Sequence, residues 1–151
     1  MSDIAALLER VRAATGPDRY ADCHLWVIAQ GGDARMHVCD SSTQDFIWER
    51  GIDGFWVRDV VKFRAVPRYT ASVDAALALV ERATPDSGPN MVYSFDLNWH
   101  ASAHAEMSYT AELYVAEGNP PDMTSYQGQA PTLPLAIIAA LLTALKDSNH
   151  E

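Results

Sequence analysis

YTASVDAALALV, residues Tyr69–Val80, is the stretch that decides how the rest of the chain can be organised. Pro67 comes just before it and disfavours a helical backbone at the preceding residue, so the chain must arrive extended or turning. Thr70 or Ser72 can then cap a helix, and Asp74 adds a negative charge to the first turn. The apolar residues follow at helical spacing: Val73, Ala76, Leu77 and Val80. This stretch therefore predicts a core helix that ends near residue 82.

Two more helices are expected, one towards each end of the chain. Residues 3–14 carry an apolar stripe and stop at Gly16-Pro17, a typical helix end. Residues 133–145 follow Thr132, which can cap a helix, and Pro134 is tolerated in a first turn. This last stretch is apolar on nearly every side. Such a helix is buried on more than one face, either between a sheet and another helix or partly under a second subunit.

Strands are expected on both sides of the central helix. Residues 22–30 contain Trp26, Val27 and Ile28, which favour a strand, and residues 35–39 follow the Gly31-Gly32 turn as its hairpin partner. Residues 91–99 and 105–115 alternate between apolar and polar side chains, which predicts a second hairpin with one buried face. A turn at residues 101–103 would place His100 opposite His104, and Asn98 opposite Glu106.

Two segments have weaker patterns. Residues 41–66 form an irregular, aromatic-rich excursion with glycines beside the aromatic side chains, and a short strand is expected within 57–66. Residues 117–130 are rich in Gly, Pro and Asn and are expected to form a loop. Helices and hairpins follow one another without alternating single strands, so the fold class is α+β. We expect one domain over residues 1–151, with an antiparallel sheet of about four to five strands packed with three helices.

Composition limits the function. The chain has 151 residues, a net charge of −9 and only 11 Lys and Arg, which argues against nucleic acid as a ligand. The N-terminal residues lack the basic and apolar pattern of a signal peptide, and the longest apolar run is too short to cross a membrane. We therefore expect a cytoplasmic protein that does not bind membranes. Cys23 and Cys39 would then stay reduced, and their spacing is not that of a zinc site.

Three stretches together resemble a known family. They are Ile4–Arg19 (IAALLERVRAATGPDR), Pro67–Val80 (PRYTASVDAALALV) and Ala130–Leu145 (APTLPLAIIAALLTAL). In combination they are similar to the phage α-β-α (ABA) sandwich domain family, small proteins encoded by tailed phages and prophages. The resemblance implies helices on both faces of a sheet and a location in the host cytoplasm. It implies no catalytic residues, and the chain departs from the family pattern in the long aromatic segment 41–66.

One cluster has the residue types of a metal or acid–base site: Asp96, His100, His104 and Glu106. On one face of a hairpin, two imidazoles and a carboxylate could bind zinc, or a His–carboxylate pair could act as a base. The spacing also suits a solvated strand face with cross-strand polar pairs. No other element converges on the cluster by sequence, and no catalytic residue is assigned. No cofactor is expected apart from zinc at this cluster.

A second candidate surface is aromatic. Trp48, Phe55 and Trp56 could bind a partner, or they could pack as a satellite core beneath the excursion. His24 and His37 are expected to face each other in the first hairpin as core or edge residues.

Three hypotheses follow. The first is a phage or prophage accessory protein without catalytic activity, which contacts a protein partner or forms a homo-oligomer. The second is a small metal-dependent or His/Glu hydrolase that uses the 96–106 hairpin. The third is an acidic inhibitor of a host nucleic-acid-binding protein.

Overall fold

The protein is described here from a computed structural model that defines residues 4–31, 35–40, 45–52, 55–83, 92–102, 105–117 and 122–148. In these residues the fold is α+β, as expected, with antiparallel strands throughout. The helices are α1 (Ile4–Ala13), α2 (Arg19–Ala29), α3 (Val73–Ala83) and α4 (Leu133–Ser148), and a 3-10 turn, η1, spans Phe63–Ala65. The strands are β1 (Arg35–Asp40), β2 (Asp45–Ile52), β3 (Phe55–Lys62), β4 (Val92–Ser102), β5 (Ala105–Glu117) and β6 (Asp122–Ala130).

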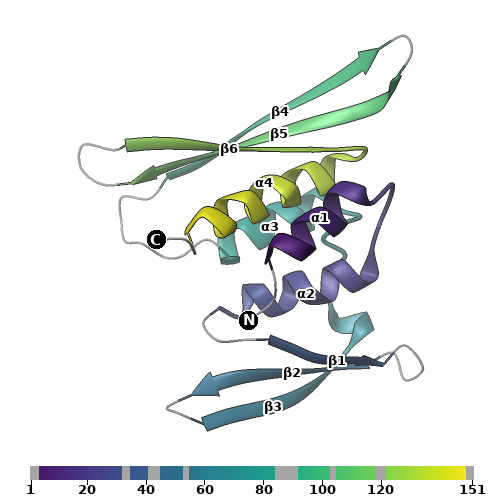
Figure 1. Ribbon diagram of the computed structural model, residues 1–151, viewed down its shortest axis with the longest axis vertical. Coiled ribbons are helices and arrows are strands. Elements are labelled where there is room, and N and C mark those ends of the chain that lie inside the picture. Colours follow the sequence, from purple (N-terminus) through teal and green to yellow (C-terminus); the bar gives the residue numbers. More distant parts are fainter. Residues whose placement is uncertain are drawn as a thin grey trace.

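The strands form two separate sheets with the helices between them. One sheet has the order β1-β2-β3 and the other β4-β5-β6. Figure 1 shows α1, α3 and α4 beneath the β4-β5-β6 sheet, α2 below them, and the β1-β2-β3 sheet at the opposite end of the molecule. This differs from the expected single sheet of four to five strands with three helices. Helices lie on the inner face of each sheet, whereas the resemblance implied helices on both faces of one sheet.

The core is centred on α4. Its residues from Leu135 to Leu142 are all buried. α4 packs on β5 and β6 on one side and on α1 and α3 on the other, which explains a helix that is apolar on nearly every face. Of the two arrangements expected for this helix, a position between a sheet and other helices is the one observed. The hydroxyl of Thr132, expected to cap it, has no hydrogen-bond partner among the described residues.

The chain around α3 follows the prediction, with one change at its start. Ser72 caps the helix, because its Oγ accepts from the backbone N–H of Ala75 at 3.3 Å. Thr70 has a different role. Its Oγ1 accepts from the N–H of Asp18 at 2.8 Å, and its own N–H donates to Oδ1 of Asp22 at 2.8 Å. The segment before α3 is therefore attached to the start of α2.

Arg19 completes this attachment. It pairs with the fully buried Asp22 at 2.9 Å and also donates to three backbone carbonyls, those of Phe63, Val66 and Pro67. A buried carboxylate is tolerated only when its oxygens are hydrogen-bonded or paired, and both conditions are met here. We call this set of contacts the α2 junction: Asp18, Arg19, Asp22, Thr70 and the carbonyls of Phe63, Val66 and Pro67.

Residues 22–29 belong to α2 and Gln30 is its C-cap, so the strand expected at residues 22–30 is wrong. The helix lies between the other helices and the β1-β2-β3 sheet, and its side chains are buried on both sides. A helix covered on two sides has a continuous apolar sequence that resembles a buried strand. Residues 35–40 are a strand as expected, but β1 pairs with β2.

The two segments with weak patterns are largely strand. Within the supposed excursion 41–66, β2 and β3 form an antiparallel hairpin that pairs Asp45 with Lys62 and Ile52 with Phe55. The supposed loop 117–130 contains β6, which pairs with β5 from Tyr109–Ala130 to Glu117–Asp122. The fully buried positions of β6 are Gly128 and Ala130, both small, because α4 approaches the strand closely at Gly128. A Cβ there would lie 2.2 Å from the carbonyl oxygen of Ala136 and 2.3 Å from the backbone nitrogen of Ala140.

This contact gives a stability prediction. Gly128→Ala should lower the free energy of unfolding by at least ~2 kcal/mol, because a methyl group cannot fit against the α4 backbone without moving the helix. Urea denaturation measures the loss. Gly16→Ala is the matched control, since nothing lies within 4 Å of a Cβ at that position. Equal stability of the two variants would show that the close approach of α4 to β6 is not present.

Candidate functional site

The cluster expected to bind metal lies on the β4–β5 hairpin. Asp96 and His100 are in β4 and Glu106 is in β5, while His104 and the side chains of the other three are outside the described part. The backbone register pairs His100 with Ser108 and Asn98 with Thr110, so the expected pairs His100–His104 and Asn98–Glu106 are wrong. The reason is that the chain turns back later than expected: Ser102 still belongs to β4 and pairs with Ala105, and the register also shifts between His100 and Ser102.

The register also changes the neighbours of Asp96, which pairs with Glu112. Within the ranges that the structure describes, no three His, Cys, Asp or Glu side chains are grouped to hold a metal ion. The zinc hypothesis for Asp96, His100, His104 and Glu106 therefore stays a prediction.

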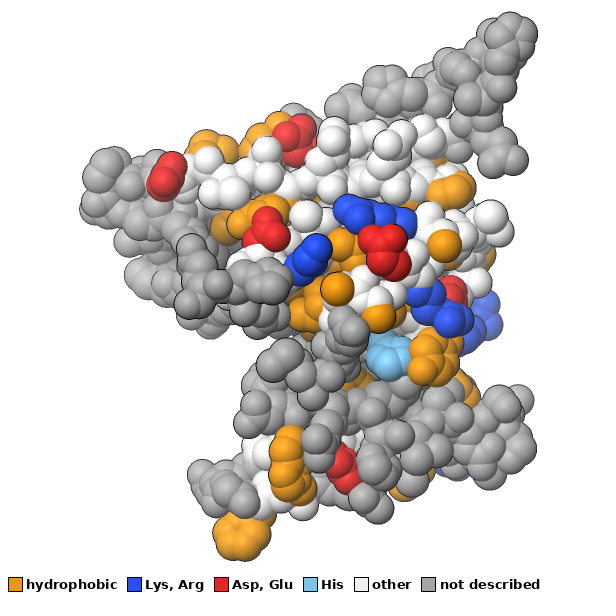
Figure 2. Space-filling model, in the orientation of Figure 1, with side chains coloured by type: hydrophobic (Ala, Val, Ile, Leu, Met, Phe, Trp, Pro, Cys, Tyr) orange, Lys and Arg blue, Asp and Glu red, His pale blue; other side chains and the backbone are white. Residues whose placement is uncertain are grey.

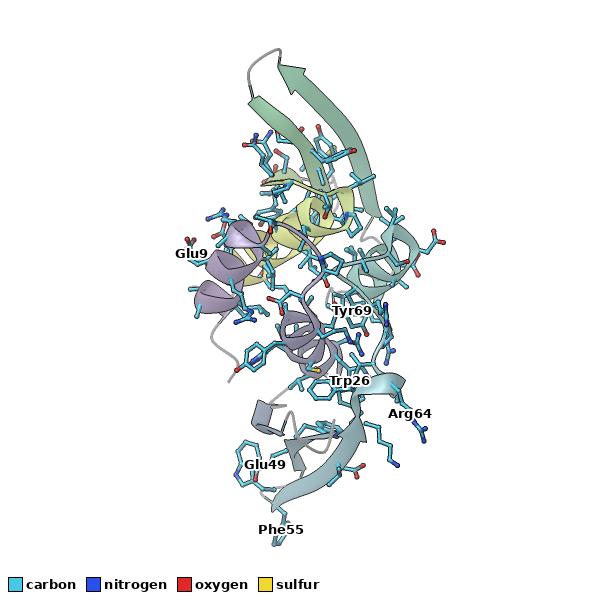
Figure 3. All side chains as sticks on the ribbon, turned by 90° about the vertical axis from the view of Figure 1, so that its right-hand side faces the viewer. Glu9, Trp26, Glu49, Phe55, Arg64 and Tyr69 are labelled. Carbon is cyan, nitrogen blue, oxygen red and sulfur yellow. The ribbon has the colours of Figure 1, made fainter. Side chains whose placement is uncertain are left out.

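The three aromatic residues expected to bind a partner separate into two groups. Trp48 is half-buried and packs edge-to-face on Trp26 of α2, with ring centroids 5.1 Å apart. It therefore joins the sheet to the helices. Phe55 and Trp56, at the tip of the β2–β3 hairpin, are 76% and 52% exposed. Figure 3 shows Phe55 at the end of the sheet farthest from the other labelled residues, and Trp26 between α2 and the sheet.

More apolar surface continues along β3 from the hairpin tip. Val60 is 57% exposed, and side chains alternate between faces along a strand, so Trp56, Val60 and the exposed Lys62 share one face. β3 is an edge strand of its sheet as described. Its backbone is partly protected from pairing with another strand, because the N–H of Val60 donates to the carboxylate of Asp59 at 2.7 Å. Figure 2 shows hydrophobic side chains at the lower left of the molecule, over the hairpin tip of Figure 1.

The same sheet contains a buried acid. Glu49, in β2, is buried, and the ladder places Arg35 of β1 and Arg58 of β3 directly opposite it. The described side chains of this sheet therefore include one buried acid in the central strand and exposed apolar residues at the hairpin tip and on the edge strand.

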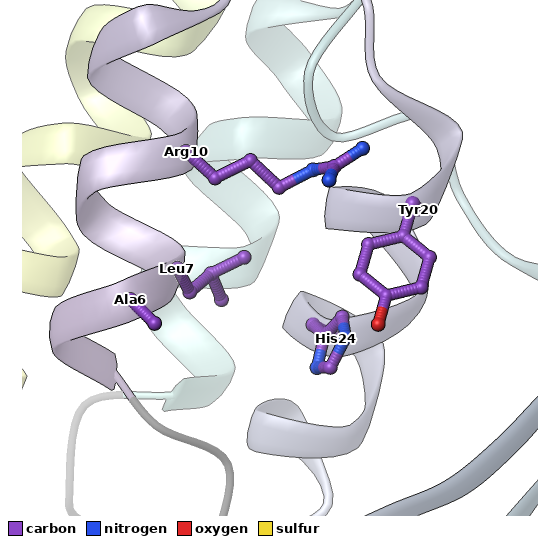
Figure 4. A pocket seen from close by; sticks show the side chains of 5 residues that line it. All are labelled: Ala6, Leu7, Arg10, Tyr20 and His24. Atoms are coloured by element: carbon purple, nitrogen blue, oxygen red, sulfur yellow. The ribbon is translucent and has the colours of Figure 1, made fainter.

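A hollow of about 290 Å³ lies between α1 and α2. It is lined by Ala6, Leu7 and Arg10 of α1 and by Tyr20 and His24 of α2, and Figure 4 shows these side chains around it. Because the sequence predicts a strand at residues 22–30, it does not predict a hollow between two helices there. Gly16-Pro17-Asp18 could have revealed α2, since Asp18 caps the helix by accepting from the N–H groups of Tyr20 and Ala21.

Arg10 is held in a fixed position at this hollow. Its Nε and Nη2 donate to the two oxygens of Asp18 at 2.6 and 3.1 Å, and its guanidinium lies 4.6 Å from the centre of the Tyr20 ring. Burial by itself raises the pKa of Asp18. The bonds from Arg10 and from the helix N–H groups outweigh this effect, so the pKa of Asp18 lies below its ordinary value.

His24 completes the group. Its ring meets Tyr20 edge-to-face, with centroids 4.6 Å apart. Its pKa is lowered, first because burial disfavours the imidazolium and second because Arg10 repels it, while Asp18 acts in the opposite direction. His24 is therefore on a helix beside Tyr20 and Arg10, which corrects the expected place in a hairpin facing His37. Cys23, the neighbouring residue, is buried and is not part of a disulfide within the described residues.

Comparisons with known proteins give no family for the chain. No family model matches it, and no curated protein matches it. In the described part of the chain, no helix is long and apolar enough to span a bilayer.

The lowered pKa of His24 predicts a pH dependence of stability. The unfolded chain binds this proton near pH ~6.5, and the folded protein binds it only at lower pH. Stability due to His24 is therefore complete above about pH 6.5 and is lost as pH falls through its folded pKa. His24→Gln should lose less stability than the unchanged protein between pH ~7.5 and ~5. Chemical denaturation at both pH values measures this, and parallel losses would contradict the assignment.

Proposed function

We propose that the chain is a phage- or prophage-encoded accessory protein of the host cytoplasm. It acts by binding another protein and has no catalytic activity of its own. The resemblance supports this origin, because its three stretches include α1, α3 and α4, the helices that pack together under the β4-β5-β6 sheet.

The observation that carries the binding function is the exposure of two adjacent aromatic residues, Phe55 and Trp56, at a hairpin tip. A tryptophan half open to water, beside an exposed phenylalanine, is typical of a residue that becomes buried in a partner. The tip lies at one end of the molecule, away from α1, α3 and α4, so it can enter a concave surface without moving the core.

Charge indicates the kind of partner. Residues 45–68 contain five Lys and Arg against four Asp and Glu, a net charge of +1, although the whole chain carries −9. The exposed Lys62, Arg64 and Arg68 follow the hairpin. The partner is therefore a protein with an apolar pocket for the aromatic tip and acidic groups facing the base of the hairpin, where these cations lie at the opposite end of β3 from Phe55, since complementary charges guide association and select the partner.

Substitution at the tip tests this function. A tagged bait should recover a protein from infected or lysogenic host cells, and Phe55→Ser and Trp56→Ser should each weaken binding of the purified partner at least ~30-fold, about 2 kcal/mol. Met123→Ser is the matched control, since Met123 is 62% exposed but lies on the other sheet. Binding should also weaken with added salt.

Two outcomes would contradict the proposal. One is equal partner binding by the two tip variants and the Met123 control. The other is self-association of the purified protein that Phe55→Ser and Trp56→Ser abolish, as measured by analytical ultracentrifugation, because the surface would then belong to a second copy of the chain.

A further inference from the structure

The hollow between α1 and α2 has an apolar wall and a polar rim. Ala6 and Leu7 provide the wall, while Arg10, Tyr20 and His24 surround the rest (Figure 4). A space of about 290 Å³ lies at the small end of the range that holds small molecules in proteins. Its walls come from two helices that the α2 junction and the Arg10–Asp18 pair hold in place, so the hollow is already formed without a ligand.

Arg10 has bonding capacity that the fold leaves unused. A guanidinium has five N–H groups, and the bonds to Asp18 use one from Nε and one from Nη2. Asp18 and the Tyr20 ring fix the plane of the group, so the remaining donors keep their direction. Planar, fixed donors of this kind suit a carboxylate, which can accept two parallel hydrogen bonds.

His24 supplies the second polar group. Within the described residues, its ring nitrogens have no hydrogen-bond partner, and its ring packs edge-to-face on the Tyr20 ring. The charged groups that act on it are Arg10 from α1 and Asp18 at the start of α2. Because Asp18 neutralises Arg10, the hollow is close to neutral as long as His24 is uncharged. An incoming anion would therefore favour the imidazolium form of His24.

We propose that this hollow binds a small carboxylate that carries a short apolar tail. The carboxylate accepts hydrogen bonds from the free N–H groups of Arg10 and faces His24, and the tail packs on Ala6 and Leu7. Binding takes up a proton at His24, so affinity increases as pH falls. The site is separate from the β2–β3 hairpin, and it stands whether or not the hairpin binds a protein.

Benzoate and its neutral isostere benzamide test the site with the full chain. The His24 imidazole resonance, identified by its loss in His24→Gln, is followed by NMR as pH changes with each compound present. Benzoate should raise the pKa of His24, and its dissociation constant should be up to about tenfold lower near pH ~5.5 than near pH ~7.5, since one pKa unit corresponds to a factor of ten. Benzamide should leave the titration of His24 unchanged.

Two Arg→Lys variants test whether Arg10 is the residue that binds the carboxylate. Arg10→Lys keeps the charge but loses the planar donors, so it should weaken benzoate binding at least ~fivefold. Arg12→Lys is the control, because Arg12 pairs with Glu9 and does not line the hollow. The proposal is overturned if benzoate leaves the His24 titration unchanged, if benzamide acts like benzoate, or if both variants bind benzoate as the unchanged protein does.

Discussion

The structure depends on one buried interaction, the carboxylate of Asp22 with the backbone N–H of Thr70 and the guanidinium of Arg19. Asp22 is in the first turn of α2, and Thr70 is in the turn before α3, 48 residues later. A buried carboxylate is costly unless such partners surround it, so the two segments must meet in one orientation. The chain between them, which includes β1, β2 and β3, is thereby closed into a loop attached at both ends.

This constraint divides the molecule into two parts with different roles. The β4-β5-β6 sheet packs on α4, and α4 packs on α1 and α3, so this part contains most of the side chains that are buried in the described residues. The β1-β2-β3 sheet has fewer helical contacts: α2 covers it at β1, and Trp26 meets Trp48. Phe55 and Trp56 are not part of the buried core, so the hairpin can expose them. That arrangement suits a protein with a stable body and a projecting binding surface.

Much of the fold could be predicted from local patterns. Local patterns predict three of the helices, α1, α3 and α4, because their apolar residues recur at helical spacing. They predict the β4–β5 hairpin because its side chains alternate between apolar and polar. α2 lacked such a signal, because a helix with neighbours on two sides loses its polar face. β6 lacked one because close packing on α4 requires Gly128 and Ala130 where a strand would normally have large apolar residues. The register of β4 and β5 depends on the point at which the chain turns back, between Ser102 and Ala105, and on one bulge, and the alternation of side chains indicates neither.

The candidate sites could likewise be predicted only as far as residue type and local pattern allow. Phe55 and Trp56 were found as candidates by residue type alone, but only the structure separates them from Trp48. Arg10, Tyr20 and His24 come together through the angle between two helices, one of which was predicted as a strand. The contacts that fix α2 in this position, the Arg10–Asp18 pair and the α2 junction, are polar, and no periodic pattern of side chains indicates them.

The α2 junction is tested most directly by removing one hydroxyl. Thr70→Val keeps the shape of the side chain but leaves the N–H of Asp18 without its acceptor, whereas Thr70→Ser keeps the hydroxyl. The free energy of unfolding, measured by chemical denaturation, should fall by ~1–3 kcal/mol for valine and by much less for serine. Equal stability of the valine variant and the unchanged protein, or an equal loss for serine and valine, would contradict the account.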